Sequence, residues 1–188
     1  MRITVAGTGY VGLSLAVLIS KYHDVIAYDK NKEVVNLIKK SKSPFKDVEL
    51  ENFLKKEKLH LYATSDMTEA FDKSDVVIVC TPTDYDHESG KFDTSSVEDV
   101  VKHSLELNKN TLIVIKSTIP MGFTSKLRDK YKTDKIIFSP EFLRETKAIY
   151  DNLYPSRIIV GSNCENGKKF AKILEKCAIK KDVPIIFM

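Results

Sequence analysis

The sequence contains little cysteine and no long apolar run, and each absence excludes a class of protein. Three cysteines among 188 residues, with no CxxC spacing, argue against a disulfide framework and against a structural metal site such as zinc. No apolar run approaches the ~20 residues of a membrane span, and the start "MRITVAGTGY" does not resemble a signal peptide. We therefore expect a cytoplasmic protein with no bound metal and no membrane partner.

Each cysteine has an expected place that does not require a reactive thiol. Cys80 ends the apolar run "DVVIVC" and is expected to be a small buried hydrophobic residue. Cys177 falls on the apolar side of a late helix, and Cys164 lies in an expected loop. A catalytic thiol at Cys164 is the less favoured alternative.

The net charge of +4 does not indicate a nucleic-acid-binding protein. Lysine clusters such as "KKSK" and "KKEK" belong to a chain whose lysines are mostly interleaved with acids, as on a solvated surface. Lys168, Lys172, Lys176 and Lys180 recur every four residues, but the apolar residues between them predict the outer face of a helix. No aromatic side chains alternate with these lysines to form a stacking platform, so no nucleic-acid partner is expected.

Short, almost wholly apolar runs alternate with amphipathic segments along the chain. Such runs are typical of parallel strands covered on both faces, and they occupy residues 2–6, 25–29, 76–80, 111–115, 136–138, 157–160 and 184–187, with a weaker strand at 59–63. Helical patterns occupy residues 11–21, 31–41, 94–108, 123–132 and 165–179. The alternation predicts an α/β fold with a doubly wound, mostly parallel sheet and helices on both faces.

A glycine-rich turn joins the first expected strand to the first expected helix. The stretch "VAGTGYVG" places Gly7, Gly9 and Gly12 in the G-x-G-x-x-G spacing, which permits a tight turn, an approaching pyrophosphate and close helix packing. Asp29 ends the second strand, where a carboxylate can accept ribose hydroxyls and repel a 2′-phosphate. The pattern predicts a Rossmann-like domain that binds NAD in preference to NADP. A tight turn without a ligand is the alternative.

Polar motifs follow three further strands, at the edge where open α/β sheets bind ligands. "CTPTDYD" follows 76–80, "KSTIPMGFT" follows 111–115 and "SPEFLRE" follows 136–138. They bring to one rim the side chains of Thr81, Thr83, Ser117, Thr118, Glu141 and Glu145. Taken singly, the hydroxyls also suit helix caps, and the two acids also suit a helix N-terminus. We expect "SPEFLRE" to open a helix that points both acids into the crevice.

The motifs "GTGYVGLS", "TPTDYD", "KSTIPMGFT", "SPEFLRE" and "YDNLYPSRIIV" resemble those of the nucleotide-sugar 6-dehydrogenases, the UDP-glucose/GDP-mannose dehydrogenase family. The resemblance covers essentially all of the sequence and implies NAD as the cofactor and a UDP-sugar as the substrate. It implies oxidation of UDP-glucose at C6 to UDP-glucuronate, through two hydride transfers in one site. Another nucleotide sugar, such as GDP-mannose or an N-acetylated UDP-sugar, and a stand-alone NAD-binding module are the alternatives.

The resemblance also implies roles for individual residues. Thr118 lies beside the nicotinamide and helps to hold a catalytic water, Glu141 activates the hydrolytic water, and Glu145 lies near the nicotinamide end of the cofactor. Cofactor contacts are implied at Gly7, Gly9, Tyr10, Val11, Gly12, Asp29, Thr83, Thr118 and Glu145. Substrate contacts are implied at Glu141, Phe142, Leu143, Arg144 and Glu145.

The sequence departs from the family in a way that bears on activity. The family traps its aldehyde on a cysteine in a "GGxCxPKD"-type motif, and none of the three cysteines here has that context. The family's active-site lysine and asparagine come from a long helix that would follow residue 188. We therefore expect residues 1–188 to be the N-terminal NAD-binding domain of a longer enzyme, without its central helix and its C-terminal UDP-sugar-binding domain. The longer enzyme is expected to be a homodimer and the isolated chain to be inactive, with the oligomeric state of the chain left open.

Overall fold

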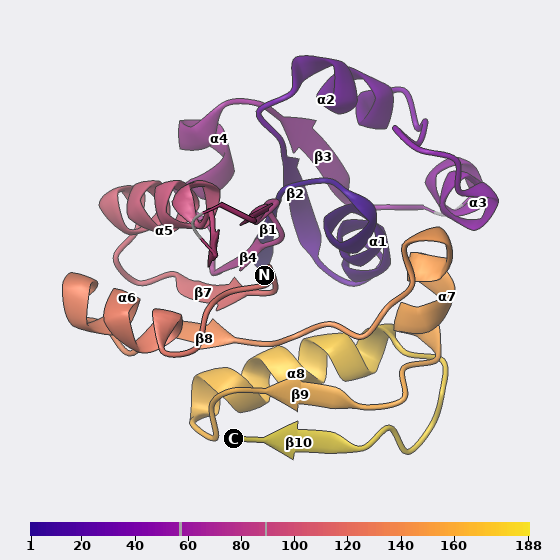
Figure 1. Cartoon of the computed structure of the whole chain (residues 1–188). Helices are drawn as coiled ribbons and strands as arrows, with labels where there is room; N and C mark the ends of the chain where they lie inside the picture. The colour runs from indigo at the N-terminus through magenta and orange to yellow at the C-terminus, as the bar shows by residue number, and fades with distance from the viewer. Residues whose placement is uncertain (57, 89) are drawn as a thin grey trace.

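A six-stranded parallel sheet forms the centre of the molecule in a computed structural model that describes residues 1–56, 58–88 and 90–188. The strands lie in the order β3-β2-β1-β4-β7-β8, and each neighbouring pair is parallel. Figure 1 shows this sheet, whose strands are β1 (Arg2–Ala6), β2 (Asp24–Tyr28), β3 (Leu61–Thr64), β4 (Val76–Val79), β7 (Leu112–Ile115) and β8 (Ile136–Phe138). The strand order reverses between β1 and β4, which is the crevice where such sheets bind ligands.

Burial on both faces explains why the strands are continuous apolar runs. Every residue of β4 and β7 is buried, and these two strands pair in register from Val76 with Leu112 to Val79 with Ile115. A strand at the middle of a covered sheet has no solvent face on which polar residues could alternate. The expected α/β class and the parallel arrangement are therefore confirmed, including the weaker strand at 59–63, which forms β3.

Helices cover both faces of the sheet, so the expected doubly wound arrangement is also confirmed (Figure 1). Apolar side chains on one face pack with those of α1 (Tyr10–Ile19), α2 (Lys32–Lys39), α3 (Val48–Lys56), α7 (Ala148–Leu153) and α8 (Glu165–Cys177). Those on the other face pack with α4 (Met67–Phe71), α5 (Ser95–Leu107) and α6 (Phe123–Tyr131). In α8, Phe170 and Ile173 are buried while Lys168 and Lys172 are exposed, as the lysine spacing predicted.

A second, two-stranded sheet extends the molecule beyond β8. Its parallel strands are β9 (Ile158–Val160) and β10 (Ile185–Phe187), and Figure 1 shows them below β8 with α8 beside them. The Gly161 N–H donates to the Phe138 carbonyl at 2.7 Å, and the Ser139 hydroxyl donates to the Ile159 carbonyl at 2.7 Å. These bonds fix the end of β8 from the side opposite β7.

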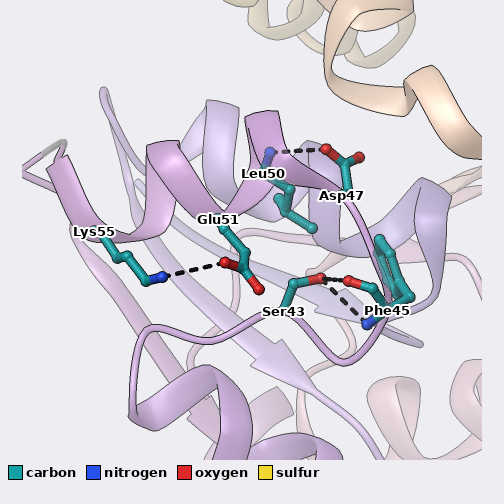
Figure 2. Close-up of polar contacts among 6 residues, drawn as sticks. All are labelled: Ser43, Phe45, Asp47, Leu50, Glu51 and Lys55. Atoms are coloured by element: carbon teal, nitrogen blue, oxygen red, sulfur yellow. Dashed lines mark hydrogen bonds and ion pairs between the residues drawn. The ribbon is translucent and has the colours of Figure 1, made fainter.

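Several short elements were not predicted from the sequence, and α3 is one of them. Asp47 precedes this helix and accepts a hydrogen bond from the Leu50 N–H at 2.9 Å, which caps the first turn (Figure 2). Just upstream, in the loop that leads to α3, the Ser43 hydroxyl donates to the Phe45 carbonyl at 2.6 Å. The Phe45 ring lies 4.1 Å from the ring of Tyr10, the first residue of α1. This segment therefore packs on the beginning of α1.

The other unpredicted elements are α4, α7 and a small hairpin formed by β5 (Tyr85–Asp86) and β6 (Lys91–Phe92) after the threonines of "CTPTDYD". Across the described residues, no helix is both long enough and apolar enough to cross a bilayer.

Candidate dinucleotide and acid site at the strand ends

The glycine turn has no room for side chains at two of its three glycines. Gly7 has a φ of +89°, and a Cβ there would lie 2.6 Å from the Cys80 carbonyl oxygen. A Cβ on Gly12 would lie 1.8 Å from the Gly7 carbonyl oxygen, so α1 can approach the turn only with glycine at this position. Gly9 is different, because no neighbouring atom of the described residues lies within 4 Å of its ideal Cβ. The space over Gly9 is open to a ligand, as a pyrophosphate at the N-terminus of α1 requires.

Asp29 is held against the glycine turn by hydrogen bonds to both of its carboxylate oxygens. Its Oδ2 accepts from the Thr8 N–H at 2.9 Å and from the Thr8 hydroxyl at 2.6 Å. Its Oδ1 accepts from the Asn31 N–H at 2.9 Å, while the Asn31 side chain caps α2 by accepting from the Glu33 N–H. The predicted ribose-binding acid therefore lies beside the predicted phosphate-binding turn.

The motifs after β4 and β7 are joined by hydrogen bonds. The Ser117 hydroxyl donates to the Thr81 carbonyl at 2.6 Å, and the Ser96 hydroxyl of α5 donates to the Thr81 hydroxyl at 3.0 Å. Because the Cys80 carbonyl and the Thr81 N–H also border Gly7, the glycine turn and these two motifs form one continuous rim. Thr83 is half-buried and Thr118 is exposed on this rim. The residue that caps α6 is Gly122, so Thr118 does not serve as its cap.

The expectation that "SPEFLRE" opens a helix is wrong. Residues 139–144 form an irregular segment, and only a short 3₁₀ helix, η1 (Glu145–Lys147), follows it. Arg144 has an extended backbone because its N–H and guanidinium both donate to Asp151 of α7, the closest of these contacts being 2.6 Å. The Arg157 guanidinium stacks 4.3 Å from the centre of the Phe142 ring. These contacts hold the segment open rather than helical.

The two acids of this segment have different environments. Glu141 is half-buried, and its Oε2 is buried without a hydrogen-bond partner among the described residues. Burial raises the pKa of Glu141, the nearby Lys116 charge opposes that rise, and the Glu145 carboxylate adds to it. Glu145 is exposed. The fold therefore raises the proton affinity of Glu141.

Lys116 is a functional candidate that sequence reasoning missed. It directly follows β7, is only 7% exposed, and donates to the Ser139 carbonyl at 3.1 Å and the Pro140 carbonyl at 3.3 Å. A lysine at the end of an apolar strand would ordinarily extend into solvent, and the sequence signal available was only its place in "KSTIP". Asp151 and Arg157, which hold Arg144 and Phe142, were also missed, because their partners are close only in the folded chain.

The three cysteines differ in burial, since Cys177 is buried, Cys80 is partly buried and Cys164 is exposed. Burial raises the pKa of Cys80 and of Cys177 to about 12 each, so both thiols are neutral at physiological pH. Cys164 is exposed at the N-cap of α8, where a hydrogen bond with Ser162 lowers its pKa. The expectation that Cys177 belongs to the apolar core is confirmed, and Cys80 packs against that core but is only partly buried.

The sheet topology, the open space at Gly9 and the acid beside the turn define a dinucleotide-binding domain of the Rossmann class. Residues 1–177 match the protein family described as the UDP-glucose/GDP-mannose dehydrogenase family, NAD binding domain. The chain belongs to this family, and its cofactor is NAD.

Curated relatives and solved structures agree with this assignment. The chain is 48% identical over 192 aligned residues to a UDP-glucose 6-dehydrogenase of Streptococcus pneumoniae, covering 99% of this chain and 49% of that protein. It is 42% identical to a UDP-glucose 6-dehydrogenase of Campylobacter jejuni, covering 100% of this chain and 48% of that protein. A UDP-glucose dehydrogenase from Pyrobaculum islandicum superposes with a TM-score of 0.86 at 26% identity, over 100% of this chain and 46% of that one. The chain thus spans about half the length of its curated relatives.

Two glycine-to-alanine variants separate the packing and binding roles of the turn. Gly12→Ala is expected to destabilise the chain by about 2–4 kcal/mol, because its Cβ would overlap the Gly7 carbonyl. Gly9→Ala is expected to leave stability within about 0.5 kcal/mol but to weaken NAD binding roughly tenfold or more, since the methyl group fills the path of the pyrophosphate. Urea unfolding and calorimetric titration with NAD measure the two effects. Equal stability losses in the two variants would contradict this interpretation.

Glu141→Gln is expected to stabilise the chain at neutral pH. The pKa of Glu141 is raised above the 4.5 of an unperturbed glutamate, so the folded chain binds this proton more tightly than the unfolded chain. The contribution of Glu141 to stability therefore falls as the pH rises from 4.5 through the raised pKa. Thermal melting of Glu141→Gln should exceed that of wild type by on the order of 2 °C at pH 7, and the two should converge near pH 4. The exposed Glu106→Gln is the control, and a Glu141→Gln gain that does not depend on pH would refute the assignment.

Proposed function

We propose that this chain is the cofactor-binding part of an enzyme that oxidises UDP-glucose to UDP-glucuronate with NAD, in two hydride transfers at one site. The observation that carries the proposal is the continuous rim linking the glycine turn and Asp29 to the half-buried Glu141. UDP-glucose is favoured because the relatives at 48% and 42% identity are UDP-glucose 6-dehydrogenases.

The residues around the glycine turn suit the two ends of an adenosine diphosphate group. Gly9 leaves backbone N–H groups at the start of α1 open to phosphate oxygens. Asp29 offers a carboxylate for ribose hydroxyls and disfavours a 2′-phosphate at the same place. Tyr10 and Val11 follow directly on α1, and Thr83 lies on the adjoining rim. NAD, when bound, supplies the hydride acceptor for the alcohol carbon.

Glu141 is proposed to act as the general base that activates water in the hydrolytic step. A base whose pKa is raised by burial accepts a proton more readily than an ordinary glutamate and remains usable near neutral pH. Thr118 is proposed to help hold the water, since a hydroxyl can donate one hydrogen bond and accept others. Glu145, exposed beside Glu141, is proposed to face the nicotinamide end of the site. The nucleophilic cysteine is proposed to lie in the part of the enzyme corresponding to the remaining half of the relatives.

Residues 142–144 are proposed to present their backbone to the sugar nucleotide. Phe142 is 54% exposed yet held by Arg157, and Arg144 is held by Asp151. Leu143, between them, is half-buried. A backbone fixed from both sides can offer N–H and carbonyl groups without the entropic cost of ordering a loop on binding.

Asp29→Asn tests the cofactor assignment. The variant keeps the shape of the side chain but loses the charge-assisted hydrogen bonds to the ribose, so NAD binding is expected to weaken about tenfold. NADP binding is expected to weaken less or to improve, because the repulsion of its 2′-phosphate is removed. Calorimetric titration of wild type and Asp29→Asn with both cofactors gives the comparison. Equal affinity of the wild-type chain for NAD and NADP would refute the role of Asp29.

Turnover tests the reaction itself. The 188-residue chain with UDP-glucose and NAD is expected to bind NAD without sustained NADH formation. The polypeptide from the complete reading frame is expected to release two NADH for each UDP-glucose consumed. Sustained NADH formation by residues 1–188 alone would overturn the proposed division of the site. Faster turnover of GDP-mannose or of an N-acetylated UDP-sugar would reassign the substrate, and a reading frame that ends at residue 188 would favour a stand-alone NAD-binding module.

A further inference from the structure

The buried ammonium group of Lys116, which contacts the segment 139–145, has no role in the function proposed above. Lys116 is 7% exposed, and burying an ammonium group is costly unless charges and hydrogen bonds around it compensate. Accordingly, burial lowers the pKa of Lys116. A methionine or leucine would fill the same space at the end of β7 without this cost. The position of the charge therefore calls for an explanation beyond packing.

The ammonium group is directed at the backbone that carries Glu141. Its Nζ donates to the carbonyls of Ser139 and Pro140, at 3.1 and 3.3 Å. Ser139 is itself fixed, because its N–H donates to the Ile115 carbonyl at 2.9 Å and its hydroxyl donates to the Ile159 carbonyl. Proline at 140 limits the backbone freedom that remains just before Glu141. Lys116 thus ties the end of β7 to the two residues that precede the acid.

The charge of Lys116 acts on the Glu141 carboxylate, which lines the same cavity. Lys116 and Glu141 both line a cavity of about 60 Å³ behind the 139–143 segment. Two titratable groups affect the pKa of Lys116 electrostatically, Glu141 and the Cys80 thiol at the end of β4. The thiol is neutral at physiological pH because burial raises its pKa to about 12. Burial raises the pKa of Glu141, the Lys116 charge lowers it, and the Glu145 carboxylate of η1 raises it.

The other charged groups near the cavity are engaged elsewhere. Asp151 accepts the hydrogen bonds of Arg144, and Arg157 stacks on Phe142. Glu141 is therefore the carboxylate that receives the attraction of the Lys116 charge.

We propose that Lys116 is a positioning residue that keeps Glu141 ionised and correctly placed, through the two carbonyls and through its buried positive charge. The inference rests on the proposed function for its catalytic meaning, because an ionised Glu141 is what a general base requires. It concerns the charge state of one side chain, however, and can be measured without NAD or a sugar nucleotide.

The test follows the ionisation of Glu141 in the 188-residue chain by ¹³C NMR of labelled glutamate carboxyls, with Glu141→Gln to assign the signal. Lys116→Gln keeps a hydrogen-bond donor for the carbonyls but removes the charge, Lys116→Met removes both, and Lys116→Arg keeps both. In Lys116→Gln and Lys116→Met the titration midpoint of Glu141 is expected to rise by about one pH unit, a tenfold change in its proton affinity. In Lys116→Arg it should stay near the wild-type value.

An unchanged midpoint in Lys116→Gln would overturn the proposal. If the two neutral variants fail to fold, each is combined with Glu141→Gln, which removes the uncompensated carboxylate. Recovery of folding in a double variant supports the charge pairing, whereas continued failure of both assigns Lys116 a purely structural role and refutes the proposal. Because NAD affinity and NADH production are measured separately, an error in the proposed function would leave the NMR result intact.

Discussion

The close approach of α1 to the turn that precedes it is the contact on which the rest of the site depends. At Gly12 the helix lies so near the Gly7 carbonyl that no side chain fits between them, and this allows the buried face of α1 to pack on the sheet. Gly7 in turn borders the backbone of Cys80 and Thr81 at the end of β4. From Thr81 the hydrogen-bonded rim continues to Ser117, and through the neighbouring Lys116 to the backbone before Glu141. The position of the backbone before Glu141 thus depends, through this chain of contacts, on the close packing of α1 against the glycine turn.

Much of this arrangement could be predicted from the sequence because it depends on local, repetitive physics. Strands buried on both faces must be continuously apolar, so β1, β4 and β7 were recognisable, and the glycine spacing is dictated by the turn itself. The failure at residues 139–145 has a different origin. The two acids and the apolar residues between them have helical spacing, but Arg144 and Phe142 find partners in Asp151 and Arg157. Asp151 and Arg157 come close to this segment only after α7 and β9 have packed in the folded chain. No local sequence pattern predicts these contacts.

The burial of Lys116 escaped prediction for a related reason. A lysine that follows an apolar strand is equally compatible with solvent and with the interior, and only the path of the chain after β8 decides between them. Here that path brings two carbonyls to the ammonium group. The short helices α4 and α7 lack the length over which periodicity becomes distinct. The sequence therefore specified the scaffold and the residues at its rim, whereas the electrostatic environment of Glu141 comes from contacts between distant segments.

The hydrogen bonds between Asp29 and Thr8 have a consequence for how cofactor preference can evolve. The carboxylate proposed to bind the ribose also supports the backbone of the glycine turn, because it accepts hydrogen bonds from the Thr8 N–H and hydroxyl. A change at this position alters both recognition of the 2′ group and the shape of the turn, so the two properties are inherited together. Full adaptation to a phosphorylated cofactor therefore calls for more than the loss of the Asp29 charge, because Thr8 also needs a new hydrogen-bond partner.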